Sequence, residues 1–385
     1  MPYYATRGSI PHKRHTQFRS ETGQLYTEEL FGTEGFTGVH SLLYHVTAPT
    51  KVESVEYVGP VHRHFQTEGP LVHRHFLTAQ MEPEAAPNAV DGRMMFLGNE
   101  DVAFGIAVVT EPMPYFYRTA EGDELFYIHF GTGLLETGFG TLAYRPGDYL
   151  VLPVGTTYRV VPDAGVATRM VVIESRGAIV PPGRYVNESG QLMEHSPYCE
   201  RDLRLPDLVT HNVTGDFQVR VRTRGQVTAY NLSYHPLDVV GWDGALYPYA
   251  FNIEDFEPIT GRVHQPPPVH QTFAGKGFVV CSFVPRKLDY HPLSIPVPYH
   301  HSNIESDEVI YYADGQFMSR RGIEVGSVTL HPGGIAHGPQ PGVVEKSLGA
   351  TETAELAVMM DTFRPLGVAD SAAASEDPAY MFSWR

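Results

Sequence analysis

The sequence predicts an all-β protein, and two observations carry this prediction. Short runs of Val, Ile, Leu, Tyr and Phe recur between glycines and prolines, which number 37 and 31. Such runs are "VAFGIAVVTEPMPYFYR" at 102–118, "GTLAYRPGDYLVLPVGTTYRVV" at 140–161 and "KGFVVCSFVPR" at 276–286. Several short apolar runs separated by turn residues are typical of sandwiches and barrels. Long helical periods are hard to find, which agrees with frequent turns.

Elements other than strands are few. The best helical candidate is "YTEELFG" at 26–32, one or two turns closed by Gly32. The stretch "DSAAASEDPAY" at 370–380 is small and polar with one proline, so it predicts a linker or mobile tail. The closing "MFSWR" predicts an aromatic anchor onto the body of the protein or onto a partner subunit.

Composition and charge exclude some partners. A formal net charge of −16 makes nucleic acid and anionic membrane surfaces poor partners, because both attract mainly Lys and Arg. Cys199 and Cys281 provide no disulfide framework and favour a reducing compartment. The start has no apolar signal segment, and no stretch approaches the roughly 18 apolar residues of a membrane span. We therefore expect a soluble, cytoplasmic protein.

An internal repeat organises the chain. In each copy an acidic residue lies seven positions before a glycine, and a later glycine is followed at fixed spacing by Pro, Gly and then Tyr or His. The copy at 122–160 consists of Glu124, Gly131, Gly147, Pro153, Gly155 and Tyr158. The copy at 306–339 consists of Glu308, Gly315, Gly326, Pro332, Gly334 and His337.

These spacings resemble the two signature motifs of the cupin barrel, H-x-H-x(3,4)-E-x(6)-G and G-x(5)-P-x-G-x(2)-H. Because the two motifs occur in the same order twice, a chance match is a poor explanation. The resemblance implies a bicupin, with two double-stranded β-helix (jelly-roll) barrels and few short helices. We assign residues 1–225 to an N-terminal cupin-like domain and residues 226–385 to a C-terminal cupin domain with a tail.

The two copies differ in the donors they offer to a metal. The first copy has Tyr117 and Thr119 in place of the H-x-H pair, and Tyr158 in place of the last histidine. We therefore expect a degenerate, metal-free barrel with a structural role. In the second copy, the two positions of the H-x-H pair, counted back from Glu308, are occupied by His301 and Asn303.

With His337, the second copy offers two histidines and one carboxylate, the facial triad typical of non-haem Fe(II) oxygenases. Strand alternation would put His301 and Asn303 on one face and His300 on the other. Asn303 would then lie at the rim as a neutral hydrogen-bonding group. Asp307 and Glu305 compete with Glu308, but only Glu308 keeps both motif spacings. The alternative is a second ligand-free barrel whose histidines are merely hydrogen-bonded.

Around this triad the chain resembles homogentisate 1,2-dioxygenases. "LYTEELFGTEGFT" near the start, "DVVGWDGALYPYAFNIEDF" at 238–256, "PYHHSN" and "LHPGGIAHGPQ" carry the likeness. It implies an Fe(II) enzyme that uses O2 to open the ring of a hydroquinone acetate to maleylacetoacetate, in tyrosine and phenylalanine breakdown. It also implies homo-oligomers, either trimers or dimers of trimers.

The resemblance also implies roles for residues around the metal. His331 matches a family histidine near the substrate and is a candidate either for supporting a metal ligand or for proton transfer, although a plain strand histidine is the alternative. Asp243 stands where the family motif has a histidine, and it would serve as the acid or base. Phe317 replaces a tyrosine that touches the substrate. Arg286, in "FVPRK", is the first candidate for binding the substrate carboxylate, and Arg320 and Arg321 follow it.

Further histidines lie outside the motifs. "VHRHF" occurs at 61–65 and again at 72–76, and alternating His and Arg on an exposed β-hairpin explains it better than a metal site. "RVHQPPPVHQTF" at 262–273 carries His264 and His270 on a stiff loop that could line the site or a subunit interface.

The sequence therefore favours a bicupin Fe(II) dioxygenase that cleaves homogentisate. A related dioxygenase acting on gentisate, hydroquinone or another dihydroxy-aromatic acid is the first alternative, which the changes at Asp243 and Phe317 would fit. The second alternative is a metal-binding cupin without oxidative turnover, either an isomerase or a small-molecule binding protein.

Overall fold

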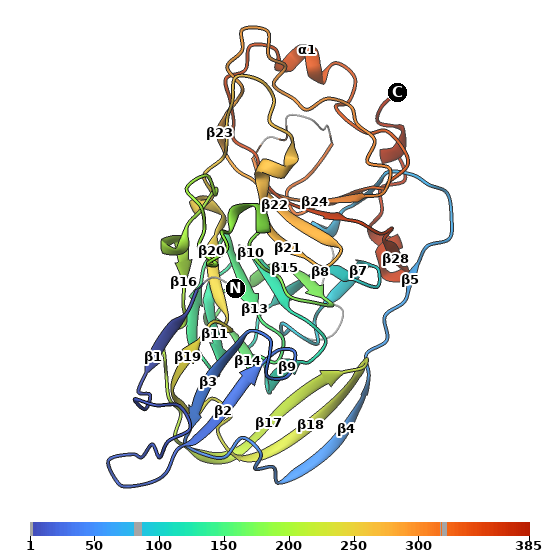
Figure 1. Cartoon of the computed structure of the whole chain (residues 1–385). Helices are drawn as coiled ribbons and strands as arrows, with labels where there is room; N and C mark the ends of the chain where they lie inside the picture. The colour runs from blue at the N-terminus through green and yellow to red at the C-terminus, as the bar shows by residue number, and fades with distance from the viewer. Residues whose placement is uncertain (1–2, 81–86, 316, 318–321) are drawn as a thin grey trace.

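The computed structural model describes residues 3–80, 87–315, 317 and 322–385, and it confirms the all-β prediction (Figure 1). Within these residues the only α-helix is α1 (Val343–Ser347). The remaining helical elements are 3-10 turns: η1 (Thr78–Gln80), η2 (Gly183–Tyr185), η3 (Glu200–Asp202), η4 (Ile253–Asp255), η5 (Pro267–His270), η6 (Asp370–Ser375) and η7 (Tyr380–Phe382). No helix in the described ranges has the length and apolar character needed to cross a membrane.

Strands of the described residues form three large sheets and two small ones. The nine-stranded sheet runs β16 (Leu203–Arg204), β20 (Tyr249–Asn252), β13 (Asp148–Leu152), β10 (Glu124–Phe130), β15 (Thr168–Ser175), β8 (Val102–Val109), β7 (Met94–Gly98), β28 (Gly367–Ala369) and β5 (Phe65–Gln66). The seven-stranded sheet runs β12 (Gly140–Tyr144), β11 (Gly133–Thr137), β14 (Tyr158–Pro162), β9 (Phe116–Thr119), β17 (Thr214–Thr223), β18 (Gln226–Tyr234) and β4 (Ser54–Pro60). The six-stranded sheet runs β21 (Gln271–Gly275), β22 (Phe278–Phe283), β27 (Leu356–Thr362), β24 (Asp307–Asp314), β25 (Val328–His331) and β6 (Arg74–Phe76). The small sheets are β1 (Ala5–Gly8), β19 (Val239–Gly244), β3 (His40–His45) and β2 (Thr27–Gly32), and the pair β23 (Arg286–Lys287) and β26 (Glu352–Thr353).

The two copies of the repeat fold alike. The order β8–β15–β10–β13 in the nine-stranded sheet recurs as β22–β27–β24–β25 in the six-stranded sheet. The turn after the first strand of each motif needs glycine, because Gly131 and Gly315 have φ of 94° and 92°. A Cβ there would also meet the backbone carbonyl of Ala167 or Ala354. Identical backbone demands therefore explain why the spacing of the repeat is visible in the sequence.

Alternation along the strands separates a core shared by both barrels from the interior of each barrel. On β10, Leu125 and Tyr127 belong to the shared core, whereas Phe126 lies inside the N-terminal barrel. On β24, Val309 and Tyr311 enter the same shared core. Each such side chain stabilises the fold by about 1.5–3 kcal/mol on burial. A one-residue slip of β24 would turn the whole set over, so this packing fixes which residues face the C-terminal barrel.

The boundary predicted between residues 225 and 226 falls in the turn of the β17–β18 hairpin, where Thr223 lies opposite Gln226. Strands also cross between the halves, because β6 pairs with β25, β28 with β7 and β20 with β13. Each half thus completes a sheet of the other, and in Figure 1 the red β28 can be seen next to the blue-green β7.

Three local predictions are wrong. Residues 27–32 form strand β2 instead of a helix, because they pair along their length with β3. The two "VHRHF" stretches do not form a hairpin: β5 pairs with β28, and β6 pairs with β25. The segment 370–380 is packed and largely structured as η6, with Ala372 fully buried and Tyr380 only 3% exposed.

Candidate metal centre

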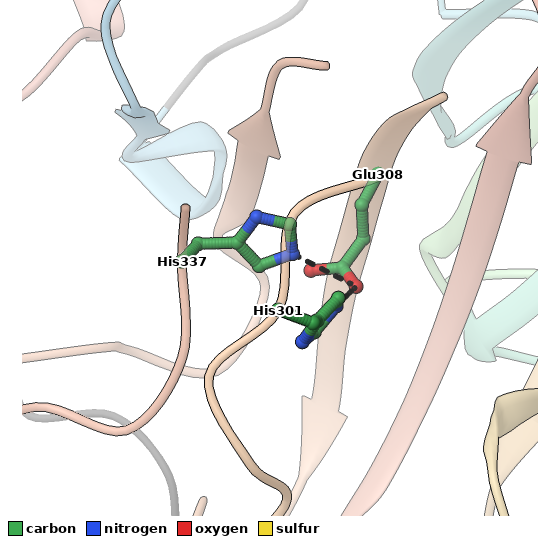
Figure 2. A group of neighbouring side chains, drawn as sticks. All are labelled: His301, Glu308 and His337. Carbon is green, nitrogen blue, oxygen red and sulfur yellow. Dashed lines mark ion pairs between the residues drawn. The ribbon is translucent and has the colours of Figure 1, made fainter. Parts of the chain in front are cut away.

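His301, Glu308 and His337 converge at one end of β24. Glu308 is the second residue of that strand, and its side chain points toward both histidines in Figure 2. Its Oε2 lies 3.9 Å from Nε2 of His301 and 3.7 Å from Nε2 of His337. The three potential ligand atoms lie within 4.8 Å of one another. The structure thus brings together the three side chains that the motif spacing selected.

The reason for this convergence differs from the one predicted. Residues 302–306 form a turn, and β24 begins only at Asp307, so strand alternation does not orient His301. Instead, His301 and His337 form an isolated bridge in which each backbone N–H donates to the other residue's carbonyl at 2.9 Å. Nδ1 of His301 also lies 3.2 Å from the carbonyl of Tyr299, which orients the ring.

The donor set fits a divalent transition metal. His337 is 2% exposed, and neither ring nitrogen has a hydrogen-bond partner among the described residues. Each unpaired buried nitrogen costs about 1–3 kcal/mol. A cation bound at Nε2 would give a partner to one of the two unpaired nitrogens of His337. Two imidazoles and one carboxylate suit non-haem Fe(II) and leave positions for other ligands.

The carboxylate of Glu308 is held by its neighbours across the sheet. His331 lies directly opposite on β25, and its Nδ1 is 2.7 Å from Oε1 of Glu308. Burial opposes ionisation, but the hydrogen bond from His331 and the positive potential of His331 and His337 hold the pKa of Glu308 well below its usual range. Asp361 lies opposite on β27, where burial and the charge of Glu308 raise its pKa to about 8. Glu308 is therefore the ionised carboxylate of the pair.

A cavity of about 140 Å³ opens beside this centre. Its apolar wall follows the face of the six-stranded sheet that carries Glu308, and one edge is closed by the stiff proline-rich loop. The lining includes His301, Glu308, Phe283, Ile310, Tyr312, Phe317, Met359, His264, His270, Arg286 and Glu355. Most of the surface area that faces the cavity is apolar, although several of these residues are charged or polar, and an apolar surface suits an aromatic ring.

Of the predicted substrate residues, two line the cavity. Phe317 lies 4.5 Å from Tyr312 between ring centroids. Arg286 reaches the cavity but pairs with Glu355, with Nη2 3.0 Å from Oε1. Asn303 is half-buried and is not among the lining residues. Arg320 and Arg321 lie outside the described residues.

Of the two predicted acid–base residues, His331 lies beside Glu308 and Asp243 does not line the cavity. His331 is fully buried behind Glu308, so it touches the metal centre through that carboxylate and does not face the cavity. Asp243 lies on β19, between β1 and β3 in a different sheet, and accepts a hydrogen bond of 2.5 Å from the Tyr4 hydroxyl. Within one chain, the structure therefore separates Asp243 from the cavity.

Several residues near the centre were missed or left open. His264 and His270 line the cavity from the proline-rich loop, which the sequence left undecided. His73, from the second "VHRHF", packs against His331 and His337 with ring centroids at 5.3 and 5.8 Å. Only the repeated H-x-H pattern could have flagged it, because the contact depends on the long-range pairing of β6 with β25.

In the first copy, an arginine stands among the residues that replace the ligands. The side chain of Arg93 is 4% exposed and forms ion pairs with Glu124 and Glu174, the latter at 2.8 Å. It also donates to the Tyr158 hydroxyl at 2.7 Å, and that hydroxyl donates to Glu124 at 2.8 Å. A guanidinium thus supplies the positive charge beside Glu124, which supports a structural role for this barrel.

Comparisons with known proteins agree with this picture. A family model described as "Homogentisate 1,2-dioxygenase N-terminal" matches residues 4–253. A relative from Saccharolobus solfataricus named "Putative dioxygenase" is 41% identical over 388 residues, covering 100% of this chain and 99% of that protein. A homogentisate 1,2-dioxygenase from Nitrobacter hamburgensis is 25% identical over 405 residues, covering 97% of this chain and 88% of that protein. Among solved structures, a cupin 2 conserved barrel domain protein from Leptotrichia buccalis is 11% identical, with a TM-score of 0.35 and coverage of 76% of this chain and 97% of that chain. A TM-score this low carries no argument about function.

Proposed function

This chain belongs to the homogentisate 1,2-dioxygenase family, and on that premise we propose that it is an Fe(II)-dependent dioxygenase that opens the ring of homogentisate. The reaction adds both atoms of O2 to homogentisate and yields maleylacetoacetate, so no further reductant is needed. The observation that carries the proposal is the convergence of His301, Glu308 and His337 at the head of an apolar cavity.

Iron bound by these three side chains would supply the activation of O2 and the electron transfer between substrate and oxygen. The protein's residues have other tasks. Glu308 contributes one negative charge to the centre, and its ionised state is secured by His331. Ile310, Tyr312 and Met359 provide the wall on which an aromatic ring lies, holding it in one orientation and excluding water.

Proton transfer to or from the substrate hydroxyl falls to the cavity histidines rather than to Asp243. His264 lines the cavity, is 33% exposed at its side chain, and has Nδ1 3.7 Å from Oδ2 of Asp289. That carboxylate can hold the His264 ring in one orientation toward the cavity. Burial, reinforced by the charges of Arg286 and His264, lowers the pKa of His270 to about 3. His270 therefore acts as a neutral hydrogen-bonding group, and His264 is the candidate base.

We expect His264→Gln to lower kcat by about 10²–10⁴-fold, the usual contribution of general acid–base catalysis, and to leave iron content unchanged. Asp243→Asn serves as the matched control, since Asp243 lies on β19 away from the cavity. Steady-state kinetics with the iron content measured on the same samples would test both. A large loss in Asp243→Asn with none in His264→Gln would restore the role that the motif alignment suggested.

A second candidate function is cleavage of a dihydroxy-aromatic compound with a different acidic group or none, such as gentisate or hydroquinone. Phe317 offers no hydroxyl to the cavity, and Glu355 neutralises Arg286 at 3.0 Å. A substrate carboxylate would therefore compete with Glu355 for the guanidinium. Both observations weaken selection for the acetate group of homogentisate.

A substrate panel tests the proposal. Protein loaded anaerobically with Fe(II) is mixed with homogentisate, gentisate and hydroquinone, and O2 consumption is followed together with the absorbance of the ring-opened product. We expect uptake of one O2 per homogentisate. Uptake with gentisate or hydroquinone alone would favour the second candidate. Absence of uptake with all three would favour a cupin without oxidative turnover, such as an isomerase or a small-molecule binding protein.

The remaining features of the proposal concern the setting of the enzyme. By family membership we propose a homo-oligomer, either a trimer or a hexamer, working in the cytoplasm. The formal charge of −16 argues against nucleic acid as a partner.

A further inference from the structure

The C-terminal segment Tyr380–Trp384 packs against the side of the metal centre that faces away from the cavity. Tyr380, in η7, is 3% exposed. Its hydroxyl lies 2.9 Å from Nε2 of His331. Nε1 of Trp384 donates to the carbonyl of Gly338 at 3.0 Å, and Gln340 donates to the hydroxyl of Ser383 at 2.6 Å. The segment therefore contacts residues next to two of the three candidate ligands.

The first contact runs through His331 to Glu308. A carboxylate oxygen only accepts hydrogen bonds, so the 2.7 Å contact with Glu308 puts the proton of His331 on Nδ1. Nε2, the other ring nitrogen of His331, lies 2.9 Å from the Tyr380 hydroxyl. These two contacts hold the His331 ring at both nitrogens, so that Nδ1 donates to Oε1 of Glu308 and Oε2 is left toward the two ligand histidines.

The second contact fixes the backbone beside His337. Trp384 holds Gly338 on one side of that residue, and Nε2 of His73 lies 3.1 Å from the carbonyl of Ala336 on the other side. The rings of Trp384 and His73 also pack together, with centroids 5.1 Å apart. Met381 also connects the C-terminal segment to His73, because its sulfur accepts a hydrogen bond from the backbone N–H of His73 at 3.3 Å.

We propose that Tyr380 and Trp384 are positioning residues of the metal centre, holding Glu308 and His337 in the geometry that binds the ion. The inference rests on the metal centre proposed above. Partners of metal ligands orient the donor atoms, and removing one commonly costs about 10–100-fold in metal affinity. Without the Tyr380 hydroxyl, the His331 ring loses its contact at Nε2, and its Nδ1 is held less firmly toward Glu308.

The principal test variant changes a single group so that packing is kept. Tyr380→Phe removes only a hydroxyl, whereas Trp384→Phe removes the indole N–H together with part of the ring that packs on His73. Phe382→Leu is the matched control from the same segment, because Phe382 is 53% exposed and its ring faces the guanidinium of Arg385 at 4.2 Å. Co(II) serves as the probe, with its dissociation constant measured by chelator competition, its visible spectrum recorded, and the melting temperature of the metal-free protein determined.

We expect Tyr380→Phe to weaken Co(II) binding by about 10-fold or more and to alter the Co(II) spectrum, while the metal-free protein melts as the wild type does. Trp384→Phe should weaken binding in the same direction, and Phe382→Leu should match the wild type. Wild-type affinity and spectrum in Tyr380→Phe would overturn the inference while leaving the metal centre intact. An equal loss in Phe382→Leu would also overturn it. Failure of the wild-type protein to bind Co(II) would instead overturn the metal centre itself, and the inference with it.

Discussion

His301→Ala and His337→Ala are each expected to abolish retention of the metal, whereas His300→Ala retains it. Each of the first two changes removes one of the three donors. The remaining histidine and Glu308 then offer only two ligand atoms. His300 is exposed and is not part of the group. It is also the neighbour of His301 in the chain, which makes it a close control for local disturbance of the loop.

The measurement is metal content per chain after anaerobic loading with Fe(II) and removal of free ion. We expect a value near one for the wild type and for His300→Ala, and a value near zero for the two ligand variants. Stoichiometric iron in His337→Ala would mean that the ion is held elsewhere. Loss of iron in His300→Ala alone would exchange the roles of the two adjacent histidines.

Arg93→Met is expected to destabilise the protein by about 3–5 kcal/mol, because breaking a buried ion pair leaves an uncompensated charge. Glu174 keeps ion pairs with Arg63 and Arg222, the latter at 2.6 Å. Glu124, which is 2% exposed at its side chain, loses its cation and keeps only the Tyr158 hydroxyl. The cost therefore comes mainly from Glu124.

The free energy of unfolding in urea would measure this loss. Lys51→Met is the control, since Lys51 and its partner Glu53 are 53% and 52% exposed at their side chains, and exposed pairs contribute about 0–1 kcal/mol. Adding Glu124→Gln to Arg93→Met should recover part of the stability, because the buried charge is then removed. A loss in Arg93→Met no larger than in Lys51→Met would contradict a structural role for the guanidinium.

The motif spacing was sufficient to find the repeat, because the turns in each copy require glycine at fixed positions and this requirement is local. Gly131 and Gly315 adopt the same positive φ, and only glycine takes that conformation without strain. The candidate ligands were then identified by their spacing from these glycines in the motifs, and the structure brings His301, Glu308 and His337 together. Their assignment as ligands stays a prediction until the metal is measured.

The geometry behind these donors was less predictable. The sequence suggested that strand alternation would put residues 301 and 303 on one face, but residue 303 lies outside any strand and a bridge to His337 positions His301. The helix predicted at 26–32 is strand β2 because pairing with β3 overrides local propensity. Propensity acts over a few residues, whereas sheet partners are chosen across the whole chain.

By itself, the sequence determined the all-β class, the duplicated barrel and the three donors, since all of these depend on turn glycines and short-range spacing. Only the tertiary structure decided that His73 and Tyr380 lie behind the metal centre, that Asp243 lies apart from it, and that His264 faces the cavity. These placements arise from strand pairings between residues far apart, such as β6 with β25 and β1 with β19. Such pairings bury surface and satisfy backbone hydrogen bonds without leaving a local pattern in the chain.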